Sequence, residues 1–154
     1  MLKRIVIQEQ DFDIGREWAD LRASLPGRAG AMAAFCGMVR DQFESESVGR
    51  LELEHYPGMT ERSIASVLDR AEQRWALDAL VVVHRVGSLM PGDQIVLVLA
   101  TSRHRQAALE GCTFVIDLLK TEAVFWKREM LESGARWIES THIDHHRSAE
   151  WRKP

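Results

Sequence analysis

The sequence contains little cysteine, only four lysines and no long apolar run. No stretch reaches the ~18 apolar residues of a membrane span, and the apolar part of the N-terminus is too short for a signal peptide. We therefore expect a cytoplasmic protein without membrane association. Cys36 and Cys112 lie far apart and form no C-x-x-C motif, so the sequence supports neither a zinc site nor a redox motif, and we expect both thiols to be buried.

The sequence also lacks an excess of positive charge. Twenty Lys and Arg residues against 23 Asp and Glu give a formal net charge of −3. This balance argues against general nucleic-acid binding, because basic residues supply most of the non-specific affinity. No G-x-G-x-x-G, P-loop, G-x-S-x-G or H-E-x-x-H motif is present. The composition, 45% hydrophobic and 28% charged, is that of an ordinary globular protein.

The length of 154 residues is typical of one domain. We assign residues 1–140 to this domain and residues 141–154 to a polar C-terminal tail. His142, His145 and His146 lie close together in the tail and could be read as a metal site. No cysteine accompanies them, however, and polar termini are commonly disordered. We therefore predict no metal site.

Periodicity of the apolar residues predicts an alternation of strands and helices. Strands are expected at 2–8, 30–40, 50–56, 79–86, 94–101, 124–129 and 135–139. Helices are expected at 12–25, at 60–75 and from 105 to about 120, with Thr60 and Ser102 as the N-caps of the last two. Residues 41–49 show no pattern and are expected to form a loop. The turn at Pro91-Gly-Asp93 predicts an antiparallel hairpin.

Two of the four lysines, Lys120 and Lys127, flank the end of the third helix. Lys120 lies in its last turn, and Lys127 lies on the next strand, on the same face as Phe125 and Glu129. The two amines could converge on one pocket. From these residues alone the alternative is favoured, in which Lys120 complements the helix dipole and Lys127 is solvated.

Other basic residues stand at the ends of predicted elements. Arg40 ends a small, apolar strand and could contact a ligand, although a solvent-facing strand end is the more common explanation. Arg103, His104 and Arg105 crowd the start of the third helix, where free backbone N–H groups attract anions. They could bind a phosphate or carboxylate, or they could be solvated residues that the helix dipole disfavours. The residues alone support both interpretations equally.

Five motifs follow one another along the chain: Phe35-Cys-Gly-Met-Val-Arg40, Leu53-Glu-His-Tyr-Pro-Gly-Met59, His84-Arg-Val-Gly87 with Pro91-Gly-Asp93, Ser102-Arg-His-Arg105, and Leu119-Lys-Thr121 to Phe125-Trp-Lys-Arg-Glu129. Taken together, over about residues 4–139, they resemble the family of the large, catalytic subunit of molybdopterin synthase. One such motif would be weak, but five at the family's spacing identify the chain as similar to this family. The resemblance implies an α/β hammerhead fold with an additional small antiparallel β-sheet.

The resemblance also implies a sulfurtransferase with a protein partner. Members of the family form a homodimer with one small ubiquitin-like sulfur-carrier subunit docked on each protomer, giving a heterotetramer. The carrier ends in Gly-Gly and delivers sulfur as a C-terminal thiocarboxylate. The enzyme inserts two sulfurs into cyclic pyranopterin monophosphate, also called precursor Z, and creates the dithiolene of molybdopterin. No metal or redox cofactor is implied, because the sulfur arrives already activated.

The family's functional positions carry over to this sequence. Lys120 and Lys127 match its two active-site lysines. The substrate-binding positions are matched by Met38, Val39, Arg40, His104, Arg105, Arg128 and Glu129. Two departures affect strand entry and local charge: Val124 stands where relatives often have proline, and Met38 stands where some have lysine.

The residue types suit the implied chemistry. Arg40, His104 and Arg105 can hold an anionic pterin phosphate through charge-assisted hydrogen bonds. We expect Lys120 to meet the thiocarboxylate and Lys127 to position substrate or move protons, since clustered cations lower the pKa of a lysine. The alternative function is a non-catalytic scaffold that binds a ubiquitin-like partner or a phosphate ligand.

Overall fold

A computed structural model describes residues 1–43 and 45–152 of the chain. The strands are β1 (Leu2–Gln8), β2 (Ala31–Met38), β3 (Gln42–Phe43), β4 (Glu46–His55), β5 (Leu77–Arg85), β6 (Gly87–Leu89), β7 (Gln94–Ser102), β8 (Phe125–Leu131) and β9 (Gly134–Trp137). The helices are α1 (Ile14–Ser24), α2 (Met59–Arg74), α3 (Arg105–Glu122) and α4 (His142–Glu150).

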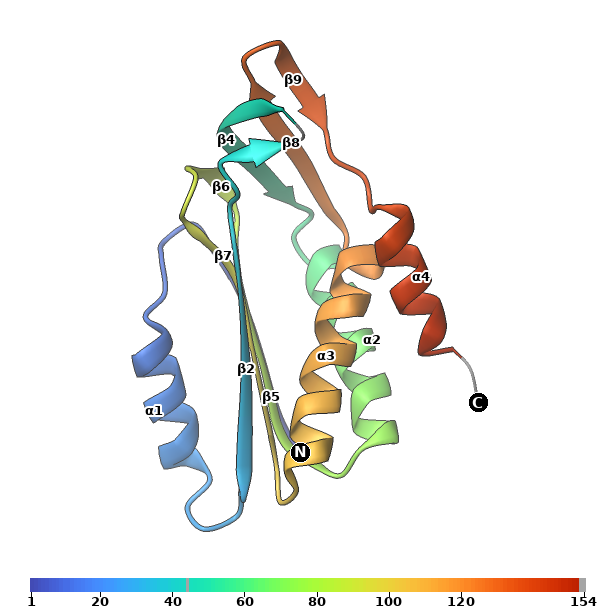
Figure 1. Ribbon diagram of the computed structural model, residues 1–154. Helices are drawn as coiled ribbons and strands as arrows, with labels where there is room; N and C mark the ends of the chain where they lie inside the picture. Colours follow the sequence, from blue (N-terminus) through green and yellow to red (C-terminus); the bar gives the residue numbers. More distant parts are fainter. Residues whose placement is uncertain (44, 153–154) are drawn as a thin grey trace.

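The strands form two sheets. The larger has the order β1-β5-β7-β2, and the smaller has the order β3-β4-β8-β9, with β6 also paired to β4. Every pairing in the smaller sheet is antiparallel. The smaller sheet stands at one end of the larger one (Figure 1). The predicted mixed α/β fold with a small antiparallel sheet is therefore confirmed.

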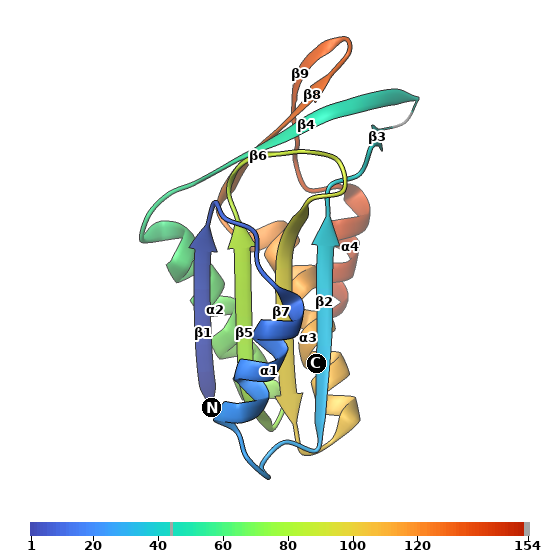
Figure 2. The same cartoon turned by 90° about the vertical axis from the view of Figure 1, so that its left-hand side faces the viewer.

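The larger sheet carries the core. Helix α1 covers one of its faces, and α2 and α3 cover the other (Figure 2). The middle strands β5 and β7 are apolar runs because both of their faces are buried: Leu97 and Leu99 pack on the α1 side, whereas Val98 and Ala100 pack on the α2 and α3 side. The predicted hairpin is confirmed, since β5 and β7 are antiparallel neighbours.

Both predicted N-caps are wrong. Helix α2 begins one residue after its N-cap Gly58, and Thr60 lies in its first turn. The Thr60 hydroxyl instead accepts a hydrogen bond from the Tyr56 N–H (2.9 Å) and donates one to the Val124 carbonyl (2.7 Å). Ser102 belongs to β7, where its hydroxyl donates to the Ala76 carbonyl at 2.8 Å. The N-cap of α3 is His104, with an extended backbone.

Two segments expected to lack structure are ordered elements. Residues 41–49 include β3 and the first residues of β4, because Val48 is buried and pairs with Leu131 of β8. Residue 44 lies outside the described residues. The polar tail contains α4, which packs on α3, so the expectation of a disordered terminus is wrong for 142–150. The tail's last two residues, 153 and 154, lie outside the described part of the chain.

The remaining expectations concern the thiols and the membrane. Cys112 is buried, as predicted, whereas Cys36 is only half-buried. Within 1–43 and 45–152, no helix is long and apolar enough to cross a membrane.

Candidate functional site

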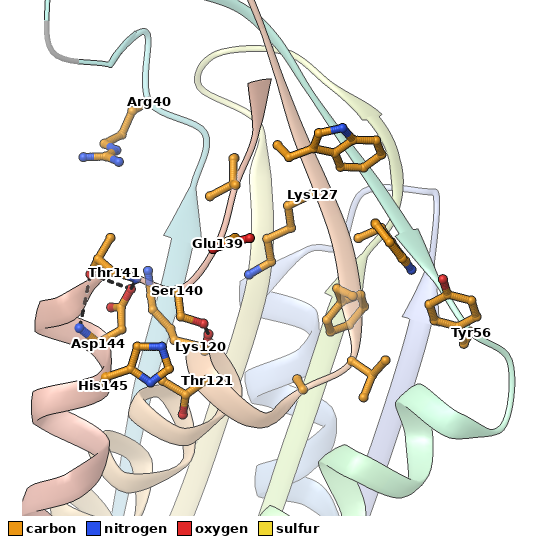
Figure 3. Close-up of a pocket in the computed structure, with 16 residues that line it drawn as sticks. Arg40, Tyr56, Lys120, Thr121, Lys127, Glu139, Ser140, Thr141, Asp144 and His145 are labelled. Carbon is orange, nitrogen blue, oxygen red and sulfur yellow. Dashed lines mark hydrogen bonds between the residues drawn. The ribbon is translucent and has the colours of Figure 1, made fainter. Parts of the chain in front are cut away.

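A pocket of about 840 Å³ opens where the end of α3, the start of β8 and the first turn of α4 meet. Lys120 from α3 and Lys127 from β8 both line it, and Arg40, which follows β2, stands at its rim. Figure 3 shows the two lysine side chains extending from different elements into the same space. The structure thus brings together three of the basic residues that the sequence singled out.

The position of Lys120 follows from the buried stripe of α3. Cys112, Val115 and Leu119 face the core, and Lys120 is the exposed residue that follows in the last turn. The Ser140 hydroxyl donates to the Lys120 carbonyl at 2.8 Å, which ties the end of α3 to the segment before α4. The Lys120 amine is therefore presented from a fixed helix end.

Lys127 lies in the middle of a three-strand arrangement. It pairs with Leu53 of β4, and its carbonyl accepts from the Ile138 N–H at 2.8 Å beyond β9. The side chain is half-buried. Burial lowers the pKa of Lys127, the charge of Lys120 lowers it further, and the carboxylate of Asp144 opposes both effects. Desolvation disfavours an ammonium group, which is why burial is the main cause.

Helix α4 supplies one wall of the pocket through Thr141, Asp144 and His145. Asp144 was not among the predicted site residues, because residues 141–154 were expected to form a polar tail. A usable signal was present: Thr141 and Asp144 have the spacing of a capping box, and the structure contains that motif at the start of α4. His142 and His146 are exposed on the same helix.

A buried histidine lies behind the pocket wall. His84 of β5 is 5% exposed and stacks on Phe125, with ring centroids 4.0 Å apart and an interplanar angle of 20°. Its Nδ1 lies 2.8 Å from the Arg85 carbonyl oxygen. Burial, with a smaller contribution from the nearby charge of Lys127, lowers the pKa of His84 to about 4, although the hydrogen bond with the Arg85 carbonyl opposes this shift. The sequence feature that indicates this burial is the position of His84 inside an apolar strand.

Arg128 and Glu129 do not line the pocket. Arg128 lies on the opposite face of β8 from Lys127, forms an ion pair with Glu52 and stands over the Trp137 ring at 5.6 Å. Glu129 shares the face of Lys127, and its Oε2 atom is buried and has no hydrogen-bond partner in the part of the chain that the structure describes. The Glu129 carboxylate is thus two residues along β8 from Lys127 but does not line the pocket.

Met38 and Val39 also lie outside the pocket lining. Met38 follows an irregularity in the β2–β7 pairing and is 56% exposed. Val39 is buried, and its backbone is fixed by hydrogen bonds with Asp93 and Gly92, each 2.9 Å long. This anchoring holds the chain where it delivers Arg40 to the rim.

His104 and Arg105 lie at the far end of α3 from Lys120. A helix of 18 residues is ~27 Å long at 1.5 Å per residue, so the basic pair is remote from the pocket. Both side chains are exposed. The expectation that Arg40, His104 and Arg105 together hold the pterin phosphate is therefore wrong for a single chain, because only Arg40 of the three lines the pocket among the described residues.

Comparisons with known proteins agree with this architecture. The family model described as MoaE protein matches residues 7–122. A molybdopterin synthase catalytic subunit from Ralstonia nicotianae is 50% identical over 147 residues, covering 96% of this chain and 83% of its own length. The solved molybdopterin biosynthesis MoaE protein from Burkholderia ambifaria is 45% identical with a TM-score of 0.84, and each chain is covered completely.

A more distant structure shares the fold. A Helicobacter pylori chain, solved in a complex of subunits 1 and 2 of molybdopterin-converting factor, is 20% identical with a TM-score of 0.67, and 92% of each chain is covered. At this identity the likeness concerns the fold alone. The family match and the two close relatives decide the assignment: the chain belongs to the MoaE protein family.

Proposed function

We propose that this chain is the catalytic subunit of a molybdopterin synthase. It transfers two sulfurs from the thiocarboxylated C-terminus of a small carrier subunit to cyclic pyranopterin monophosphate, forming the molybdopterin dithiolene. The observation that carries the proposal is the convergence of Lys120 and Lys127 on one open pocket with Arg40 at its rim. The Ralstonia nicotianae relative, 50% identical to this chain, is named molybdopterin synthase catalytic subunit.

The pocket suits an anionic substrate of the size of cyclic pyranopterin monophosphate. Its volume of about 840 Å³ lies in the range of small-molecule sites. Arg40 can bind the phosphate with two hydrogen bonds. Lys127, whose pKa is lowered, can give up and regain a proton more readily than a solvated lysine, and the exposed Lys120 can meet the thiocarboxylate. Together these cations stabilise the charge that develops as the cyclic phosphate opens.

The partner we propose is a ubiquitin-like carrier whose Gly-Gly tail enters the pocket. A glycine tail is narrow enough to enter a pocket lined by side chains from four segments, and its terminal thiocarboxylate is an anion that two amines attract. The H. pylori structure is a complex of two subunits. We also place this enzyme in the cytoplasm.

We propose a homodimer formed through β2, which would complete a heterotetramer with two carriers. Strand β2 is an edge of the larger sheet and, among the described residues, pairs with β7 alone. It carries no charged residue, and Phe35 and Met38 are 36% and 56% exposed. Uncharged apolar edges are association sites, and a second copy can add its own β2 in antiparallel orientation.

This pairing explains the remote basic pair. Eight residues of β2 span ~26 Å at 3.3 Å per residue, close to the length of α3. A two-fold axis would therefore set Arg40 at the end of one β2 near the start of the other. There Gly30 donates to the Ser102 carbonyl at 3.0 Å, beside the start of α3. His104 and Arg105 of a second copy would then reach the pocket.

The decisive test is sulfur transfer by lysine variants. With thiocarboxylated carrier and cyclic pyranopterin monophosphate, we expect Lys120→Ala and Lys127→Ala each to lower product formation by at least ~100-fold, the lower end of what positioned acid–base and electrostatic groups contribute. Lys3→Ala is the matched control, because Lys3 pairs with Asp69 and Glu72 away from the pocket. Carrier binding without product in the wild type would leave only the scaffold function.

Mixing of variant subunits tests whether a second copy of the chain contributes residues to the pocket. Lys127→Ala and His104→Ala chains, each inactive as homodimers, should regain part of the wild-type activity when they are mixed, since one of the two sites in a mixed dimer is intact. A mixture that stays inactive although mixed dimers form would refute the contribution of a second copy.

A further inference from the structure

A short linker between β9 and α4, residues Ile138 to Thr141, runs along the pocket. All four of its residues line the cavity. The Ile138 N–H donates to the Lys127 carbonyl at 2.8 Å. Two residues later, the Ser140 hydroxyl donates to the Lys120 carbonyl, also at 2.8 Å, and Figure 3 shows these two residues side by side. The β9–α4 linker is therefore bonded to both of the elements that carry the lysines.

The Lys120 carbonyl needs a partner from outside its own helix. In a continuous α-helix it would accept from the N–H four residues later, that of Val124. The Val124 N–H instead donates to the Ser63 hydroxyl of α2 at 3.2 Å, because the backbone becomes extended at Ala123. Carbonyl groups in the last turn of a helix lack intrahelical donors, and Ser140 supplies the missing hydrogen bond to this one.

The two attachments of the linker differ in kind. The bond to Lys127 joins two main chains and continues the pairing of β8 with β9, so any residue except proline at position 138 can form it. The bond to Lys120 depends on a side-chain hydroxyl at position 140. A change of Ser140 therefore releases one lysine-bearing element and leaves the other attached.

Both ends of the linker are held by the rest of the fold. The Ile138 side chain packs on the buried cluster that contains Leu53. At the other end, Thr141 is the N-cap of α4, and the ion pair of Arg147 with Asp117 at 3.1 Å joins that helix to α3. The linker can therefore hold the end of α3 in place.

We propose that the β9–α4 linker fixes the spacing between the two lysines, with Ser140 as a positioning residue that acts through the Lys120 carbonyl. The Lys120 side chain is exposed, so the position of its backbone decides where the amine can reach. Groups that act together must be held in the productive geometry, and small displacements lower the rate. The consequence for turnover rests on the proposed function, whereas the anchoring of α3 does not.

Hydrogen exchange tests the anchoring without substrate. The Ala123 N–H closes the last turn of α3 by donating to the Leu119 carbonyl at 3.3 Å. In Ser140→Ala this amide should exchange about fivefold faster, the factor that corresponds to one typical net hydrogen bond. The Ile138 amide should exchange as in the wild type, because its bond to the Lys127 carbonyl remains. Unchanged exchange at Ala123 would overturn the proposal.

Two further serine variants serve as controls. Ser140→Thr keeps a hydroxyl and should keep the wild-type exchange rate at Ala123. Ser133→Ala removes a hydroxyl from the β8–β9 turn, where it donates to Glu46 at 3.1 Å, and should leave the Ala123 rate unchanged. If Ser140→Thr or Ser133→Ala accelerates this exchange as much as Ser140→Ala does, the hydroxyl at position 140 is not what holds α3, and the proposal fails.

Sulfur transfer gives the functional readout. Ser140→Ala should lower kcat by about fivefold and leave the KM for the carrier unchanged, because the charges of the pocket stay the same; Ser140→Thr should restore kcat. A wild-type kcat in Ser140→Ala would overturn the positioning role and leave the proposed function intact. A wild type without sulfur transfer would refute the proposed function instead, and the exchange rate at Ala123 would still decide whether Ser140 anchors α3.

Discussion

The two sheets of this molecule are built in opposite ways. In the larger sheet, Leu80, Leu97 and Leu99 are fully buried between helix layers. In the smaller sheet, β9 is exposed along its whole length and β8 is mostly half-buried. Apolar burial supplies most of the folding free energy, whereas buried charges are costly unless they are paired. The comparison teaches that the candidate pocket opens where the core of the larger sheet ends, with Lys127 on a strand of the smaller sheet and Lys120 at the end of a helix that covers the larger one.

The largest expected effect probes the first half of this comparison. Leu99→Ala should lower the free energy of unfolding by ~2–5 kcal/mol, because it leaves a cavity in a close-packed core. Trp137→Ala removes a larger side chain from the smaller sheet, but that side chain is 58% exposed. The variant loses the edge-on contact with Trp126 and the Arg128 guanidinium over the ring, so we expect a loss of about 1 kcal/mol. Urea unfolding measures both. Equal losses in the free energy of unfolding for the two variants would contradict the contrast between the two sheets.

A second prediction concerns His84, where the two sheets meet. Its pKa of about 4 in the folded protein lies below the ~6.5 of an unfolded histidine, so between these values the unfolded chain binds more protons. The stabilising contribution is therefore complete above pH 6.5 and is lost as the pH falls toward 4, by about 3 kcal/mol.

Unfolding measured across this pH range checks the assignment. His84→Phe should remove most of the loss between pH 7 and pH 4 while keeping an aromatic ring next to Phe125. The exposed His142 is the control, and His142→Gln should leave the pH dependence as it is in the wild type. A His84→Phe variant that loses stability on acidification as steeply as the wild type would contradict the prediction.

The smallest of the three effects sharpens the role of α4. Trp151→Ala should lower the free energy of unfolding by about 2 kcal/mol, because a partly exposed ring loses its apolar contacts and its edge-on packing. Ile143→Ala on the same helix removes a side chain that is 70% exposed and should have almost no effect. If both variants behave alike in urea, α4 is not anchored by its tryptophan.

Local patterns were enough to predict most of the larger sheet. The buried strands near 79–86 and 94–101 and the long helix from Arg105 were visible because apolar residues recur with the periods of these elements. The position of Lys120 in the last helical turn followed from the same stripe. The grouping of Lys120 with Lys127 was only one of two options, since sequence spacing does not show which way two adjacent elements fold together.

The elements and site residues that the sequence did not predict depend on contacts between distant parts of the chain. The start of β4 forms a strand because Glu46 and Ser47 pair with β3 and the buried Val48 pairs with β8. Helix α4 forms because Trp151 packs against Trp75 and Phe114. Asp144 could not be recognised as part of the site before that helix was known. The distance between His104 and Lys120 follows from the length of α3, which the apolar stripe after Arg105 already predicted.

Val124 has a wider consequence. Its carbonyl accepts a hydrogen bond from the Thr60 hydroxyl at 2.7 Å, and its N–H donates one to the Ser63 hydroxyl at 3.2 Å. Two hydrogen bonds from α2 therefore hold the segment just before β8. A proline there could make only the first of these bonds, because it has no N–H. These two hydrogen bonds couple α2 to β8, the strand that carries Lys127. A displacement of α2 would therefore shift the position of the Lys127 amine.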